Sequence, residues 1–311
     1  MRNALLTLLG ILLLLGVAAI ALFAWLTRTP EPAEPPAPSA GERMVDAAGM
    51  SWRVREDGPA GAPAIVLIHG FSHSLESFDG WAEALSDSYR VIRFDLPGHG
   101  VTGPHPDGAY SNEDTAAQVA ELLDALELDR FVIGGSSLGG LVSWRYAAAH
   151  PERVAGLVLV SPGGYSINNV GDEPVEVPVP VQLYLRLAPD AGIRMATQTL
   201  YGDPSRLTEE RIAQIGQMMR QPGIGEALIA RLQQFTLPDP EPVLATIDAP
   251  ALILWGTADT VVPASHGARF ENVMPDARLV TYDGAGHALM EEYPAETSAD
   301  VRAFLEGIGW E

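Results

Sequence analysis

The feature that most constrains this chain is a five-residue turn, Gly135-Ser136-Ser137-Leu138-Gly139. It lies between the apolar run 131–133 and the apolar segment 141–149, and this order predicts a strand, a tight turn and a helix. Glycines flanking the turn allow the strand and the helix to approach closely. A serine at the tip of such a turn has its hydroxyl exposed over the end of the sheet. Ser137 is therefore the candidate nucleophile, although a cluster of Gly and Ser is also typical of a flexible loop.

Apolar runs separated by helical patterns recur through most of the chain. Continuous runs of this kind are typical of strands covered on both faces, as in parallel sheets, and they lie at residues 64–68, 90–94, 131–133, 154–160, 251–255 and 277–282. Two shorter segments, residues 44–46 and 51–55, predict an antiparallel pair at a sheet edge. The predicted fold class is α/β, with a mostly parallel, doubly wound sheet of about eight strands.

This alternation stops between residues 165 and 242. Val and Pro alternate at residues 175–181, which excludes a central strand there. Helical patterns follow at residues 181–187, 192–200, 208–219 and 225–235. We predict a helical cap at residues 165–242, inserted between a first core segment at 43–164 and a second at 243–311. Most of its apolar side chains are expected to pack inside the protein, and a few to line a cleft.

The amino-terminal segment differs from the rest of the chain. Residues 4–26 carry no charge and no proline, and as a helix they would extend about 34 Å, enough to cross a bilayer. We expect residues 1–26 to be an uncleaved membrane anchor, with a cleaved signal peptide as the alternative. Residues 27–42 contain five prolines and predict a stiff linker. Because Arg2 precedes the apolar run, the catalytic domain is expected to be periplasmic or otherwise extracytoplasmic.

The composition excludes several kinds of chemistry. The formal charge of −21 disfavours nucleic acid as a partner, because its phosphates would be repelled. The chain has no cysteine and no lysine, so thiolate metal sites, a cysteine nucleophile, Schiff bases and a P-loop lysine are excluded. We expect no cofactor and no metal, and the oligomeric state stays open.

Three residues with complementary chemistry follow predicted strands. Ser137, Asp259 and His287 each lie beyond the carboxyl end of a strand, where sites form in open parallel sheets. Their order along the chain is the one that accompanies a strand–turn–helix nucleophile. An imidazole can take the hydroxyl proton near neutral pH, and a carboxylate can orient the imidazole. We predict a catalytic triad with Ser137 as nucleophile, His287 as general base and Asp259 as its orienting partner.

Over residues 44–305 the sequence resembles the α/β-hydrolase family, in its esterase- and lipase-like branch. The motifs that carry the resemblance are His69-Gly70-Phe71, Asp95-Leu96-Pro97-Gly98-His99-Gly100, Gly135-Ser136-Ser137-Leu138-Gly139-Gly140, Gly256-Thr257-Ala258-Asp259 and Gly284-Ala285-Gly286-His287. The resemblance implies a cap after the sixth strand. A serine at position 137 argues against the dehalogenase and epoxide hydrolase activities of members that have an aspartate nucleophile.

An oxyanion hole needs two N–H donors. One is the N–H of Leu138, directly after the nucleophile at a helix start, and the resemblance implies the N–H of Phe71 as the second. Gly70 would let the backbone approach the substrate, and His69 is expected to brace this supporting loop. His73 is expected to lie in solvent, with a position at the mouth of the site as the alternative.

The predicted function is hydrolysis of carboxylic esters through an acyl-enzyme. The expected substrates are small molecules, namely apolar, uncharged acyl esters or acylglycerols, and the acyl chain length stays open. Two alternatives use the same triad: hydrolysis of a carbon–carbon bond of the meta-cleavage type, and cofactor-free perhydrolysis. A third alternative is a non-catalytic, membrane-tethered binding module. Glu291 and Glu292, near the start of the last helix, are expected to be solvated.

Overall fold

The computed structural model describes residues 38–311, and its centre is one eight-stranded sheet with the order β1-β2-β4-β3-β5-β6-β7-β8. The prediction of a mostly parallel sheet of about eight strands is confirmed. The strands are β1 (Glu42–Ala47), β2 (Met50–Asp57), β3 (Ala64–Ile68), β4 (Arg90–Phe94), β5 (Phe131–Ser136), β6 (Val154–Val160), β7 (Ala251–Gly256) and β8 (Ala277–Tyr282).

The strands differ in their burial and in the direction in which they pair. Strands β3, β5, β6 and β7 are buried along their whole length and pair in parallel. This is expected for apolar runs covered by helices on both faces. The first two strands contain exposed as well as buried residues, and they pair antiparallel, as predicted for the sheet edge.

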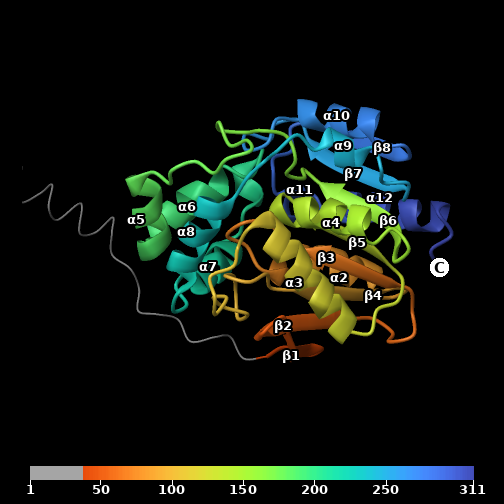
Figure 1. Ribbon diagram of the computed structural model, residues 1–311, viewed down its shortest axis with the longest axis horizontal. Helices are drawn as coiled ribbons and strands as arrows, with labels where there is room; N and C mark the ends of the chain where they lie inside the picture. Colours follow the sequence, from red (N-terminus) through yellow and green to blue (C-terminus); the bar gives the residue numbers. More distant parts are fainter. Residues whose placement is uncertain (1–37) are drawn as a thin grey trace, which may run out of the picture.

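Helices cover the two faces of the sheet and bury separate apolar clusters (Figure 1). One face packs against α3 (Asn112–Ala125), α4 (Leu138–Ala149), α9 (Glu241–Leu244) and α10 (Ser265–Val273). The other face packs against η1 (Leu75–Phe78), α2 (Asp79–Leu85), α11 (Leu289–Glu292) and α12 (Pro294–Gly307). The carboxyl ends of the parallel strands are thereby left for loops, which is where a site can form.

The segment between β6 and β7 is helical and forms a third apolar cluster of its own. It contains α5 (Val179–Leu187), α6 (Asp190–Gln198), η2 (Pro204–Arg206), α7 (Glu209–Met219) and α8 (Ile224–Gln234). Figure 1 shows these helices grouped at one end of the molecule, beyond the strand ends. The positions of the four α-helices match the predicted helical patterns to within a few residues, and the division of the chain into domains stays a prediction.

The predicted membrane anchor, residues 1–26, and most of the predicted linker lie outside the described residues. Within residues 38–311, no helix has both the length and the apolar character needed to cross a membrane.

Candidate active site

Ser137 occupies a strained turn between β5 and α4. Its backbone has φ 53° and ψ −113°, a conformation that costs a non-glycine residue about 1–3 kcal/mol. Hydrogen bonds on both sides maintain it: the Ser137 N–H donates to the Val160 carbonyl at 3.0 Å, and the Ser137 carbonyl accepts from Leu141 and Gly163 at 3.0 and 2.9 Å. Strain held in place by the surrounding backbone is typical of a functional residue.

The glycines around this turn are needed for space. A Cβ at Gly135 would lie 2.6 Å from the Ile68 carbonyl oxygen, and one at Gly139 would lie 2.6 Å from the His69 carbonyl oxygen. Real Cβ atoms do not approach backbone that closely. The turn therefore presses directly against the end of β3, as the sequence predicted.

Asp259 and His287 form a hydrogen-bonded pair. The Asp259 Oδ2 and His287 Nδ1 atoms are 2.7 Å apart, and the second carboxylate oxygen accepts the N–H groups of Val261 and Val262 at 2.8 and 2.9 Å. Burial raises the pKa of Asp259, but the His287 hydrogen bond and the two backbone donors outweigh it and leave the pKa lowered. The Asp259 carboxylate can only accept, so the proton of the neutral imidazole is on Nδ1. The Nε2 atom is then free to take a proton from a nucleophile.

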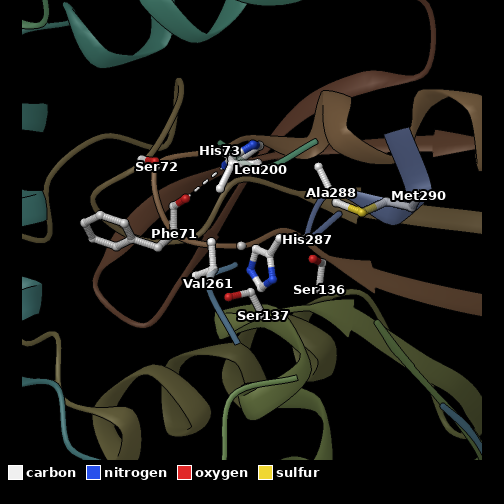
Figure 2. Close-up of a pocket in the computed structure, with 11 residues that line it drawn as sticks. Phe71, Ser72, His73, Ser136, Ser137, Leu200, Val261, His287, Ala288 and Met290 are labelled. Atoms are coloured by element: carbon white, nitrogen blue, oxygen red, sulfur yellow. Dashed lines mark hydrogen bonds between the residues drawn. The ribbon is translucent and has the colours of Figure 1, made fainter. Parts of the chain in front are cut away.

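A cavity of about 130 Å³ brings the predicted residues together (Figure 2). Ser137 and His287 both line it, as do Gly70 and Phe71 from the loop after β3. The remaining wall is both apolar and polar, and consists of Leu200, Val261, Ala288, Met290, Ser72, His73 and Ser136. Leu200 belongs to the cap region, and the sequence offered no signal that singled it out among the many apolar residues there.

The two predicted oxyanion donors come from two segments that approach the nucleophile, the start of α4 and the loop after β3. Leu138 is the first residue of α4, so its N–H has no partner within the helix. Phe71 lines the cavity, and a Cβ on the preceding Gly70 would lie 3.3 Å from Cβ of Ser137. The backbone of the two segments is therefore close together at the nucleophile.

Two buried histidines brace the loop after β3. His69 donates through Nδ1 to the Gly70 carbonyl at 2.8 Å and accepts at Nε2 from the Leu96 N–H at 2.9 Å. His99 makes the same pair of contacts, to the Pro97 carbonyl at 3.2 Å and the Ser72 N–H at 3.1 Å. Burial lowers the pKa of His69 to about 3, so both contacts are those of a neutral imidazole.

His73 was expected in solvent, and that prediction is wrong. The side chain is only 7% exposed and lines the cavity. Its Nδ1 atom lies 2.9 Å from the Phe71 carbonyl (Figure 2), and its Nε2 atom lies 3.9 Å from the Glu291 carboxylate. Burial lowers its pKa, and Glu291 opposes that effect.

The prediction that Glu291 and Glu292 are solvated is also wrong. Glu291 forms an ion pair with Arg211 of α7 through two hydrogen bonds of 2.7 and 2.8 Å, and its side chain is 7% exposed. Glu292 is 2% exposed. Most partners of the two carboxylates come from the cap region, so local sequence could not reveal their burial.

Within residues 38–311, no group of three or more His, Asp or Glu residues has an arrangement that could hold a metal ion.

Comparison with known proteins agrees with this geometry. Residues 63–190 match the family model described as alpha/beta hydrolase fold, and residues 232–307 match a model described as TAP-like protein. A hydrolase of Dechloromonas aromatica, named 2-hydroxy-6-oxononadienedioate/2-hydroxy-6-oxononatrienedioate hydrolase 1, is 31% identical over 265 residues, which cover 79% of this chain and 88% of the relative. The chain belongs to the alpha/beta hydrolase family. With the family match and a relative named as a hydrolase, the chain is a hydrolytic enzyme.

Other relatives of this hydrolase differ in activity. The dihydrolipoyllysine-residue acetyltransferase component of the acetoin cleaving system of Pseudomonas putida is 29% identical, over 88% of this chain and 70% of the relative. The solved structure of a candidate lipase, lip1 of Acinetobacter baumannii AYE, superimposes with a TM-score of 0.75 at 25% identity, covering 86% of this chain and 91% of the other. Family membership therefore leaves open which bond the hydrolase cleaves.

Proposed function

We propose that the protein is a serine hydrolase that cleaves carboxylic esters with short, uncharged acyl groups. The observation that carries the proposal is the cavity shared by the strained Ser137 and by His287, whose Nδ1 atom is hydrogen-bonded to Asp259. A serine hydroxyl becomes a useful nucleophile only when a base takes its proton, and this cavity holds both groups.

The proposed reaction follows from these positions. The Ser137 oxygen attacks the ester carbonyl while its proton passes to Nε2 of His287, and Asp259 stabilises the imidazolium. The N–H groups of Phe71 and Leu138 would stabilise the oxyanion, and losing one such donor typically raises the barrier by about 3 kcal/mol. The alcohol then leaves with the proton from His287. Water, activated by the same imidazole, releases the acid from Ser137.

The size and lining of the cavity favour a small, uncharged acyl group. Its volume of about 130 Å³ is close to that of a cavity that holds one benzene ring, about 150 Å³. No arginine is among the residues that line it. The nearby guanidinium of Arg211 is paired with Glu291, so it is not free to neutralise an acid group of a substrate.

Carbon–carbon bond hydrolysis is the second candidate, favoured by the Dechloromonas aromatica relative. The name of that relative specifies a dioate, which carries two carboxylates. A cationic side chain in the cavity would be expected for such a substrate. The absence of arginine from the lining of this cavity supports the ester proposal over the carbon–carbon alternative.

Anchoring of the chain in a membrane through residues 1–26, with an extracytoplasmic catalytic domain, is part of the proposal and rests on the sequence alone. Extraction of the full-length chain from membranes only by detergent, and not by alkaline carbonate, would support it.

The decisive experiment compares Ser137→Ala with Ser136→Ala on nitrophenyl esters of increasing acyl length and on a meta-cleavage dienedioate. We expect the wild type to prefer short esters, and Ser137→Ala to lose more than about 10⁴-fold in kcat while staying folded. Ser136→Ala should keep most activity. Undiminished ester hydrolysis by Ser137→Ala would refute the assignment, and faster turnover of the dienedioate than of any ester would establish the second candidate.

A further inference from the structure

Five consecutive residues of the cap region, residues 199–203, form a strap across the loops that carry Asp259 and His287. At its start, the Thr199 carbonyl accepts a hydrogen bond of 3.0 Å from Oγ1 of Thr260, the residue after Asp259. The next carbonyl, of Leu200, accepts the N–H of Ala288, the residue after His287, at 2.9 Å. The strap is therefore hydrogen-bonded to the residue that follows Asp259 and to the residue that follows His287.

The end of the strap is held by two neighbouring carboxylates of α11. The hydroxyl of Tyr201 donates to Glu291 at 2.9 Å. Glu292 accepts the backbone N–H groups of Gly202 at 3.1 Å and Asp203 at 2.7 Å. Glu291 and Glu292 thus bind different parts of the strap, one through a side chain and the other through the backbone.

Glu292 has a third contact that Glu291 lacks. It accepts the N–H of Gly286, the residue before His287, at 2.7 Å. One carboxylate, 2% exposed, therefore receives three backbone donors from two segments and sets the spacing between them. Charge-assisted hydrogen bonds of this kind are among the stronger contacts inside a protein.

The strap and the histidine loop also touch directly, backbone to backbone. A Cβ on Gly286 would lie 2.5 Å from the backbone nitrogen of Gly202, and a Cβ on Gly202 would collide with the Gly284 carbonyl. Leu200, in the same strap, lines the cavity. A shift of the strap would therefore move the loop of His287 and one wall of the cavity together.

We propose that Glu292 is a positioning residue for His287: by tying Gly286 to the strap, it keeps the imidazole in the orientation that proton transfer from Ser137 requires. The role of His287 in this proposal rests on the proposed function. A neutral amide at position 292 keeps one acceptor oxygen but turns an NH₂ group toward backbone N–H donors, so at least one hydrogen bond is lost. Glu292 touches neither substrate nor the reacting atoms.

The test uses the full-length protein and the variants Glu292→Gln, Glu292→Asp and Glu291→Gln. The rate of Ser137 labelling by a fluorophosphonate reports activation by His287 whichever bond is cleaved. We expect Glu292→Gln to reduce labelling and kcat by about 10- to 100-fold with KM changed less than about twofold, as for misplaced catalytic groups. In proton NMR, the His287–Asp259 hydrogen bond should give a low-field signal that is absent in His287→Ala. This signal should weaken in Glu292→Gln.

The neighbouring carboxylate is the matched control. Glu291→Gln removes a buried carboxylate that binds the same strap through Tyr201 but makes no contact to the residue before His287. It should therefore lower stability while labelling stays within about threefold of the wild type. If Glu292→Gln does not fold, Glu292→Asp, which keeps the charge and shortens the reach, should show an intermediate loss of labelling.

Two results would overturn the proposal. The first is a wild-type labelling rate and an unchanged low-field signal in the folded Glu292 variants. The second is an equal loss of labelling rate in Glu291→Gln and Glu292→Gln. Failure of the proposed function is distinguishable from both. A wild-type protein that labels but hydrolyses no ester refutes the substrate assignment alone, and one that does not label refutes the nucleophile.

Discussion

The turn that carries Ser137 and the strap that holds the His287 loop are positioned by different forces. At the turn, backbone hydrogen bonds and the absence of side chains at Gly135 and Gly139 set the geometry. At the strap, buried carboxylates bind groups that are distant in sequence; Arg211 and Glu291 are 80 residues apart. The backbone position of Ser137 should therefore be insensitive to ionisation of side chains, whereas the position of the segment next to His287 should depend on it.

The largest effect is expected at the turn. Gly139→Ala places a methyl group against the carbonyl oxygens at the end of β3, so we expect a loss of more than about 100-fold in kcat/KM and about 3–5 kcal/mol of unfolding free energy. Gly171→Ala, in a position with open space around it, is the control and should change stability by less than about 0.5 kcal/mol. Ester kinetics and urea denaturation measure both. A fully active Gly139→Ala would show that the turn tolerates side chains.

The strap should respond to loss of charge. Arg211→Leu leaves the buried carboxylate of Glu291 without its cationic partner, and it should lower the free energy of unfolding by about 3–5 kcal/mol. Arg194→Leu breaks an exposed pair with Glu209 in the same cap, where the side chains are 43% and 77% exposed, and should cost less than about 1 kcal/mol. Equal urea midpoints for the two variants would contradict a special role of the buried pair.

The same ion pair should make the cap region sensitive to acid. Burial raises the pKa of Glu291, but Arg211 outweighs it and the pKa falls to about 2 from an ordinary value of 4.5. A folded-state pKa below the unfolded value stabilises the protein above pH 4.5, and the contribution, about 3 kcal/mol, is lost as the pH falls toward 2. The difference in unfolding free energy between wild type and Glu291→Gln should therefore shrink over this interval. A difference that stays constant with pH would contradict the shifted pKa.

The smallest effect concerns the strain at Ser137. Glycine tolerates a positive φ better than alanine does, so Ser137→Gly should be about 1 kcal/mol more stable than Ser137→Ala, with both variants inactive. At Ser143, inside α4, the order should reverse, because glycine disfavours a helix interior by about 1 kcal/mol. Thermal denaturation of the four variants measures the two differences. The same order at both positions would show that the turn is not strained.

The difference between turn and strap also separates what could be predicted from what could not. The parallel sheet, the turn and the helical pattern of the cap follow from apolar periodicity and from glycines at fixed positions, which are short-range properties of the chain. The site was predictable as far as Ser137, Asp259 and His287, because each of them follows an apolar run that ends in a glycine-rich turn. Ser137 and His287 line one cavity, and Asp259 is hydrogen-bonded to His287. Their proximity was expected from the rule that strand ends in a parallel sheet lie at one edge.

Exposure of individual polar residues was not predictable in this way. His73 follows a glycine loop and Glu291 lies in the short helix α11, so each has the local sequence of a solvated residue. Each is buried because distant segments cover it. The sequence by itself determined the fold and the candidate nucleophile, since backbone sterics and apolar periodicity act between near neighbours. Only the tertiary structure decided that the strap of the cap and Glu292 hold the loop of His287, because those contacts exist only after residues about 90 positions apart have been brought together.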